Sequence, residues 1–76
     1  YLHRANEAEA IYRAALALGP HNARTLNNLA ALLQRTGRPL DAEAAYRQAI
    51  AADPGYAEAR WNLGFLLLAR GRLEEG

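Results

Sequence analysis

The chain has 76 residues, no cysteine and a formal net charge of +1, which allows one small domain and excludes a disulfide framework. It contains 18 alanines and 13 leucines but no valine, and because strands favour β-branched residues, this composition predicts an all-α protein. The near-zero charge argues against a nucleic-acid-binding protein, and no apolar run is long enough to span a membrane.

The first two predicted helices cover residues 5–18 and 23–36. Gly19 and Pro20 end the first helix, because neither residue favours a helix interior. Asn22 is then placed to cap the second helix with its side-chain oxygen. The leucines of the second helix recur at intervals of three and four residues, which is the spacing of one helix face. Two helices joined by a short turn are therefore expected.

Two further helices are predicted over residues 39–52 and 57–70, with a fifth starting at Leu73. Gly37 stands where a left-handed cap is expected at the end of a helix. Pro39 fits the first turn of the next helix, where a backbone N–H is not needed. An Asp-Pro-Gly run ends the third helix.

The chain repeats itself with a period of 34 residues. Aligned with itself at this offset, it gives 16 identical pairs among 42, where composition alone predicts about five. Such a period is typical of arrays of short structural units. The single domain, residues 1–76, is therefore expected to be a fragment of an array. Residues 1–22 hold the second helix of a preceding unit, 23–56 a complete unit, and 57–76 the first helix of a following unit and the start of its second helix.

Small, aromatic and turn-forming residues mark the complete unit: Leu29-Ala30, Leu33, Gly37, Ala42, Tyr46, Ala49 and Pro54. The half-units on either side repeat them as Ala8, Tyr12, Ala15, Pro20, Leu63-Gly64, Leu67 and Gly71. This set resembles the tetratricopeptide repeat over nearly the whole chain. The resemblance implies a right-handed α-solenoid of antiparallel helix hairpins, with about four helices here. One departure is the family's early aromatic residue, which is Leu26 in one unit and is displaced to Trp61, behind Arg60, in the next.

The recurring residues are interpreted as packing positions. Small side chains such as Ala8, Ala42 and Gly64 let helices approach closely. Tyr12 and Tyr46 are expected to fill the space between successive hairpins, and both are predicted to be mostly buried.

The sequence contains few candidate catalytic residues. Serine and cysteine are absent, and His3 and His21 are isolated from each other and from other ligands. No glycine-rich phosphate loop is present, because the glycines occur singly and those at helix ends are explained by capping. We therefore expect no enzyme activity, no metal and no cofactor.

The resemblance implies that the first helix of each unit lines a concave face, which in this family usually binds a peptide or partner protein. The residues predicted for this face are Arg24, Asn27, Asn28, Gln34, Arg35, Glu58, Trp61, Asn62 and Phe65. Asn28 and Asn62 recur one period apart, and their amides can donate to and accept from a peptide backbone. Superhelical arrays of glycosyltransferases are similar in this respect. The alternative is that both amides only pack.

Several readings stay open at this stage. Arg24 and Arg35 with the nearby asparagines could imitate the family's carboxylate clamp, although the chain has no lysine. Trp61 and Phe65 could form a hydrophobic anchor, or could be covered by a following hairpin. The chain could also serve a structural role, forming homo-oligomers through the apolar helix 57–70, or act as the substrate-recruiting arm of a larger enzyme such as a glycosyltransferase.

Overall fold

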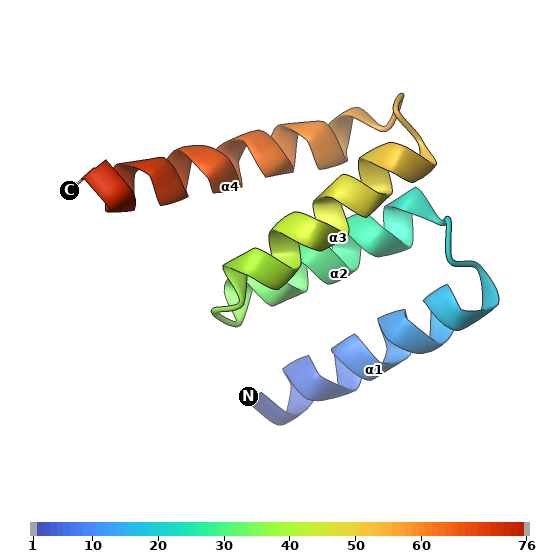
Figure 1. Cartoon of the computed structure of the whole chain (residues 1–76). Coiled ribbons are helices and arrows are strands. Elements are labelled where there is room, and N and C mark those ends of the chain that lie inside the picture. The colour runs from blue at the N-terminus through green and yellow to red at the C-terminus, as the bar shows by residue number, and fades with distance from the viewer. Residues whose placement is uncertain (1, 76) are drawn as a thin grey trace.

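The computed structural model describes the backbone of residues 2–75 and the side chains of residues 4–71. It consists of four α-helices, α1 (Leu2–Leu18), α2 (Ala23–Arg35), α3 (Pro39–Ala52) and α4 (Ala57–Glu75), and no strand occurs within these residues. The helices follow one another across a thin slab, with α2 and α3 in the middle and α1 and α4 at opposite ends (Figure 1). Its extents are 40 × 33 × 14 Å. The all-α helical repeat is confirmed.

The turns around α2 form as the sequence predicts. The side-chain oxygen of Asn22 accepts a hydrogen bond from the backbone N–H of Thr25 at 3.0 Å, which caps α2. At the other end, Gly37 has a φ of 80°, and the N–H of Arg38 donates to the carbonyl of Leu33 at 2.9 Å. Glycine adopts this left-handed conformation without the steric cost of a Cβ. The chain therefore reverses tightly, and α3 packs antiparallel to α2.

One predicted turn does not form. Gly71 stands one period after Gly37, but α4 continues through it to Glu75, so the fifth helix expected from Leu73 is absent from the described residues. A glycine permits a left-handed turn without enforcing it. Pro39 follows the first turn and ends any continuation of α2, whereas leucine and glutamates follow Gly71, and these residues favour an uninterrupted helix.

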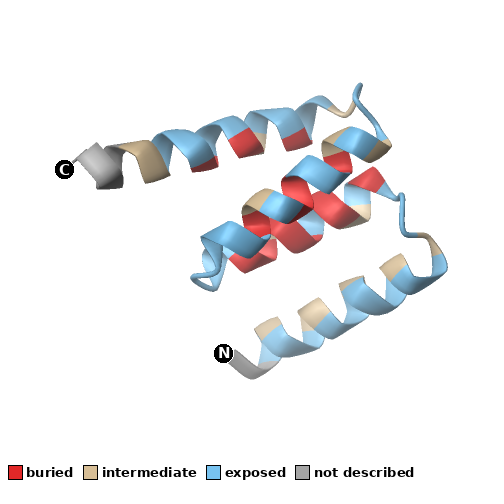
Figure 2. Ribbon diagram, in the orientation of Figure 1, coloured by how far each residue is buried: buried red, intermediate tan, exposed pale blue. Residues whose placement is uncertain are grey.

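The core lies between α2, α3 and α4. Its larger cluster contains Leu29, Ala30, Leu33, Ala42, Ala45, Tyr46, Leu63 and Leu66. A second cluster combines Ala23, Leu26, Ala49 and Ala59. Figure 2 shows the buried residues concentrated in α2, α3 and the side of α4 that faces them. The alanines let α2 and α3 approach closely, as the repeat pattern predicts.

The two tyrosines of the repeat differ in burial. Tyr46 is 1% exposed, which confirms the prediction for this residue. Tyr12, one period earlier on α1, is partly buried and packs against the larger cluster. Ala15 of α1 and Gly64 of α4 are exposed, unlike their core counterparts Ala49 and Ala30. Equivalent positions are therefore buried in the middle of the slab and exposed at its ends.

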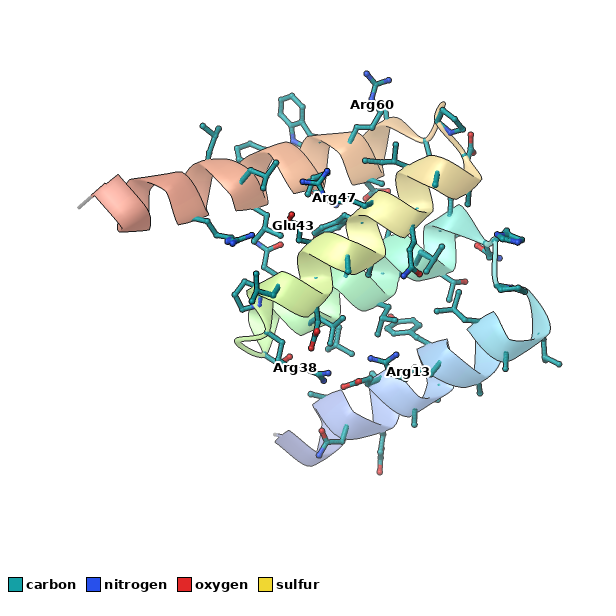
Figure 3. All side chains as sticks on the ribbon, in the orientation of Figure 1. Arg13, Arg38, Glu43, Arg47 and Arg60 are labelled. Carbon is teal, nitrogen blue, oxygen red and sulfur yellow. The ribbon has the colours of Figure 1, made fainter. Side chains whose placement is uncertain are left out.

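An acidic side chain on α1 joins this helix to the start of α3. Glu9 binds Arg13 at 2.9 Å on its own helix and Arg38, in the turn before α3, also at 2.9 Å. Arg38 in turn binds Asp41 at 3.0 Å. Arg13 and Arg38 lie between α1 and the α2–α3 hairpin in Figure 3. The four residues form an ion cluster, which we call the Glu9 cluster.

A second acidic side chain joins α3 to α4 in the same way. Glu43, one period after Glu9, binds Arg47 at 3.0 Å and also binds Arg70 of α4. Hydrogen bonds from Arg13 and then Arg38 hold the pKa of Glu9 below its ordinary value. The pKa of Glu43 is lowered likewise, mainly by the hydrogen bond from Arg47. Both carboxylates are therefore bound as anions.

Candidate peptide-binding groove

A hollow of about 540 Å³, which we call the inner groove, receives side chains from all four helices. It is lined by Tyr12, Asn28, Ala31, Gln34, Arg35, Tyr46 and Asn62. The fold thus brings together four of the predicted site residues, namely Asn28, Gln34, Arg35 and Asn62. Because these come from two consecutive repeat units, the groove follows directly from the stacking of α4 beside α2.

The two recurring asparagines have different surroundings. Asn28 is exposed, whereas Asn62 is partly buried and donates from Nδ2 to Oδ1 of Asn27 at 3.1 Å. Asn27, which the sequence also predicted for the concave face, is only 3% exposed and does not line the inner groove. Part of the hydrogen-bonding capacity of Asn62 is therefore used to satisfy a buried amide. Asn28 forms no hydrogen bond with another described residue, so its amide can bind a ligand.

The tyrosines contribute polar groups that the sequence interpretation missed. The ring of Tyr46 lies in the core, but its hydroxyl donates to Oε1 of Gln34 at 3.2 Å in the inner groove. Burial raises the pKa of Tyr46 above its ordinary value, so this hydroxyl stays protonated as a donor at neutral pH. The sequence analysis assigned both tyrosines to packing from their spacing alone. The polar role of the Tyr46 hydroxyl could have been predicted from its chemistry, since a buried tyrosine usually directs its hydroxyl toward a hydrogen-bond partner.

Arg35 supplies the positive charge of the inner groove. Its side chain is exposed and forms no ion pair with any residue that the structure describes. Arg35 and Tyr46 both line the inner groove, and the positive charge of Arg35 acts to lower the pKa of the Tyr46 hydroxyl, against the larger effect of burial. A guanidinium that has no ion-pair partner among the described residues, and that lies among neutral amides and hydroxyls, favours the binding of a carboxylate group.

Two other predicted residues lie outside this hollow. Arg24 and Glu58 are exposed near the first turns of α2 and α4. Glu58 accepts a hydrogen bond from the Tyr56 hydroxyl at 3.0 Å. Burial and this carboxylate together raise the pKa of Tyr56. Neither Arg24 nor Glu58 lines the inner groove.

The remaining predicted residues, Trp61 and Phe65, form a separate site on α4. Their rings meet edge to face with centroids 5.2 Å apart and an interplanar angle of 82°. Together with Arg60, Gly64 and Leu68 they line a hollow of about 290 Å³, which we call the aromatic ledge. Trp61 is 68% exposed and Phe65 55%. The structure therefore divides the predicted concave face into a polar groove and an apolar ledge.

In the described part of the chain, no group of three or more histidine, cysteine, aspartate or glutamate side chains is arranged to hold a metal ion. None of the described helices combines the length and the hydropathy that a membrane crossing requires.

Family comparison agrees with the 34-residue period and with the helix order. Two models of the tetratricopeptide repeat match the chain, one over residues 11–44 and the other over residues 35–76. Among curated proteins, none gives a significant match. The two matched segments cover the α2–α3 hairpin, part of α1 and all of α4. With its stacked helices and this coverage, the chain belongs to the tetratricopeptide repeat family.

Proposed function

We propose that the chain is a non-catalytic protein-interaction module whose inner groove binds a segment of a partner protein in an extended conformation. Tetratricopeptide repeats are generally protein-interaction modules. The observation that carries the proposal is the lining of the groove, where side chains with amide, hydroxyl and guanidinium groups converge from all four helices. Such groups can form hydrogen bonds with the main chain of a peptide, whereas they are poor partners for an apolar ligand surface.

Asn28 is the residue on which the proposal depends most. Its amide is exposed in the groove and forms no hydrogen bond with another described residue. A carboxamide can donate to a peptide carbonyl and accept from a peptide N–H, so it binds main chain with little regard to side-chain sequence. Arg35 adds a preference for a segment with an acidic residue or a terminal carboxylate.

The test begins with peptides selected against the chain from a displayed library of random sequences. Fluorescence anisotropy then gives the Kd of a selected peptide for the wild type and for Asn28→Ala. We expect the substitution to weaken binding by about 1–3 kcal/mol, because peptide groups buried against Asn28 lose their partner. Asn6→Ala is the matched control, because Asn6 is an exposed asparagine on α1 outside the groove.

The same peptide gives a second measurement. Arg35→Gln should weaken an acidic peptide more than its amidated counterpart, because the charge-assisted hydrogen bond is lost. If Asn28→Ala and Asn6→Ala bind equally well, or if the selected peptides instead shield the aromatic ledge, the inner groove is not the binding site.

A further inference from the structure

The inner groove and the aromatic ledge contain equivalent helix positions from consecutive repeat units, and we propose that one partner segment binds both. This segment places an acidic group at Arg35 and a large apolar side chain on the aromatic ledge. The inference rests on the proposed function, because the segment lies in the inner groove. It adds an apolar anchor, at a defined spacing from the acidic group, to the chemistry of the partner.

The aromatic ledge continues one wall of the inner groove. Ala31 and Gln34 of α2 line the inner groove. The residues 34 positions later are Phe65 and Leu68 of α4, and both line the aromatic ledge. Phe65 also follows Asn62 of the groove lining by three positions, so the two side chains are neighbours on the surface of α4. A segment that lies along the groove wall therefore reaches the ledge.

The complete repeat unit shows that this side of a first helix stays accessible when another helix is stacked beside it. With α4 in place next to α2, Gln34 is exposed and Ala31 is only partly buried. Asn27 differs, because it is 3% exposed and bonded to Asn62 of α4. Trp61 is the equivalent of Asn27. The apolar anchor is therefore assigned to the equivalents of Ala31 and Gln34, whose side of the helix remains open.

The chemistry of the wall changes over this one repeat. Asn27, Ala31, Gln34 and Arg35 in α2 correspond to Trp61, Phe65, Leu68 and Ala69 in α4. Apart from Arg60, the residues that line the ledge are apolar. The rings of Trp61 and Phe65 meet edge to face, which favours one arrangement of the pair. Burial of this surface against a large apolar side chain of the ligand is favourable in water.

The charges around the two hollows favour an acidic segment. Arg35 lines the inner groove, Arg60 lines the aromatic ledge, and neither lining contains an acidic side chain. In Figure 3 the side chain of Arg60 extends outward from α4, so its methylene groups can cover an apolar ligand group while the guanidinium stays in water. Glu58 lies in the first turn of α4 and disfavours an acidic ligand group there. The acidic group is therefore assigned to Arg35, at the end of α2.

The separation of the two helices sets the spacing of the two ligand groups. Arg35 directly follows Gln34, whose equivalent in α4 is Leu68, and the two helices run in the same direction (Figure 1). Arg35 and the ledge therefore lie at corresponding levels. Packed helices have axes about 8–10 Å apart, and an extended segment advances about 3.3 Å per residue. The apolar residue is expected about three positions before or after the acidic group.

The experiment uses the peptides selected from the random library against the 76-residue chain. Their sequences should share an acidic group and a large apolar residue about three positions apart. Fluorescence anisotropy then gives the Kd of one such peptide for Phe65→Ala, which should bind about tenfold more weakly because an apolar contact is lost. Leu40→Ala is the matched control, because Leu40 is 67% exposed on α3 and lines neither hollow.

Substitutions in the peptide show which ligand group meets which part of the chain, and they leave the fold untouched. Replacing the apolar peptide residue with alanine should remove most of the effect of Phe65→Ala and leave the effect of Arg35→Gln unchanged. Replacing the acidic group with its amide should do the reverse. Leu68→Ala is a second ledge variant and should also couple to the apolar residue. Circular dichroism of each variant should match that of the wild type.

The possible results separate this inference from the proposed function. Selected peptides that lack the apolar residue overturn the inference. So does equal binding by Phe65→Ala and Leu40→Ala while Asn28→Ala still weakens binding, and that result leaves the inner groove as the binding site. If Phe65→Ala weakens binding and Asn28→Ala does not, the peptide lies on the ledge alone. The inference and the proposed function are then both wrong.

Discussion

Asn27 is the one buried polar side chain among the residues whose burial is described. Its single strong partner is the amide of Asn62, which lies 35 positions further along the chain and on another helix. The hydrogen bond thus connects two repeat units through their first helices. It also fixes the orientation of the Asn62 amide beside the inner groove. At the residue scale, one contact combines a structural role with the shaping of the candidate site.

Replacing Asn62 with alanine removes this donor and leaves Oδ1 of Asn27 buried without a partner. We expect the free energy of unfolding to fall by about 1–3 kcal/mol, the usual cost of an unsatisfied buried polar group. Asn28→Ala is the neighbouring control and should change stability by less than about 0.5 kcal/mol, because Asn28 is exposed. Urea unfolding followed by circular dichroism measures both. Equal losses in the two variants would show that the Asn27–Asn62 bond contributes nothing.

At the scale of elements, two glycines one period apart end up in different structures. Gly37 adopts a φ of 80° and ends α2. Gly71 lies within α4, in open space, with no atom within 4 Å of an added Cβ. The difference follows from the residues after each glycine, since Pro39 prevents helix continuation.

Alanine substitutions should therefore change stability in opposite directions. Gly37→Ala places a Cβ in a left-handed conformation and should destabilise the chain by about 1 kcal/mol or more. Gly71→Ala replaces a helical glycine and should stabilise α4 by about 0.5–1 kcal/mol. Thermal unfolding of both variants beside the wild type compares them directly. A destabilising Gly71→Ala would indicate that Gly71 forms a left-handed turn in solution.

The sequence predicted those features that depend on local spacing or on the repeat itself. The Asn22 cap and the Gly37 turn follow from neighbouring residues, and both are present. The burial of Tyr46 follows from the period, which places this ring between successive hairpins, and Tyr46 is buried. The burial of Asn27 was not predictable in this way, because it depends on where α4 lies beside α2. The helical state of Gly71 was missed for a related reason. The 34-residue period shows that Gly71 is equivalent to Gly37, but it does not determine whether the chain turns there, and α4 continues through Gly71 as a helix.

At the scale of the whole molecule, acidic residues hold the outer helices to the centre. Glu9 joins α1 to the α2–α3 hairpin, and Glu43 joins α3 to α4. The pKa of each carboxyl is lower in the folded chain than its ordinary value of 4.5. The unfolded chain therefore binds protons first as the pH falls. The stability from these pairs is present above pH 4.5 and is lost as the pH drops through the lower, folded pKa values.

We expect the Tm of the chain to fall as the pH is lowered from neutral to well below 4.5, because these pairs are protonated in that range. A Glu9→Gln, Glu43→Gln double variant should show a flatter decline, because neutral amides do not titrate. Glu58→Gln is the control, since Glu58 pairs with a tyrosine hydroxyl instead of an arginine. Differential scanning calorimetry across this range measures the three profiles. Parallel profiles for all three proteins would assign the acid sensitivity to other groups.

The position of the single tryptophan gives the molecule an optical reporter at one end. Trp61 is largely exposed on the aromatic ledge, and the inner groove has no tryptophan in its lining. Indole emission shifts to shorter wavelength when water is excluded from the ring. Covering of the aromatic ledge would therefore shift the emission of Trp61, whereas filling the inner groove would leave it largely unchanged. The intrinsic fluorescence spectrum of the unlabelled chain thus distinguishes binding at these two sites.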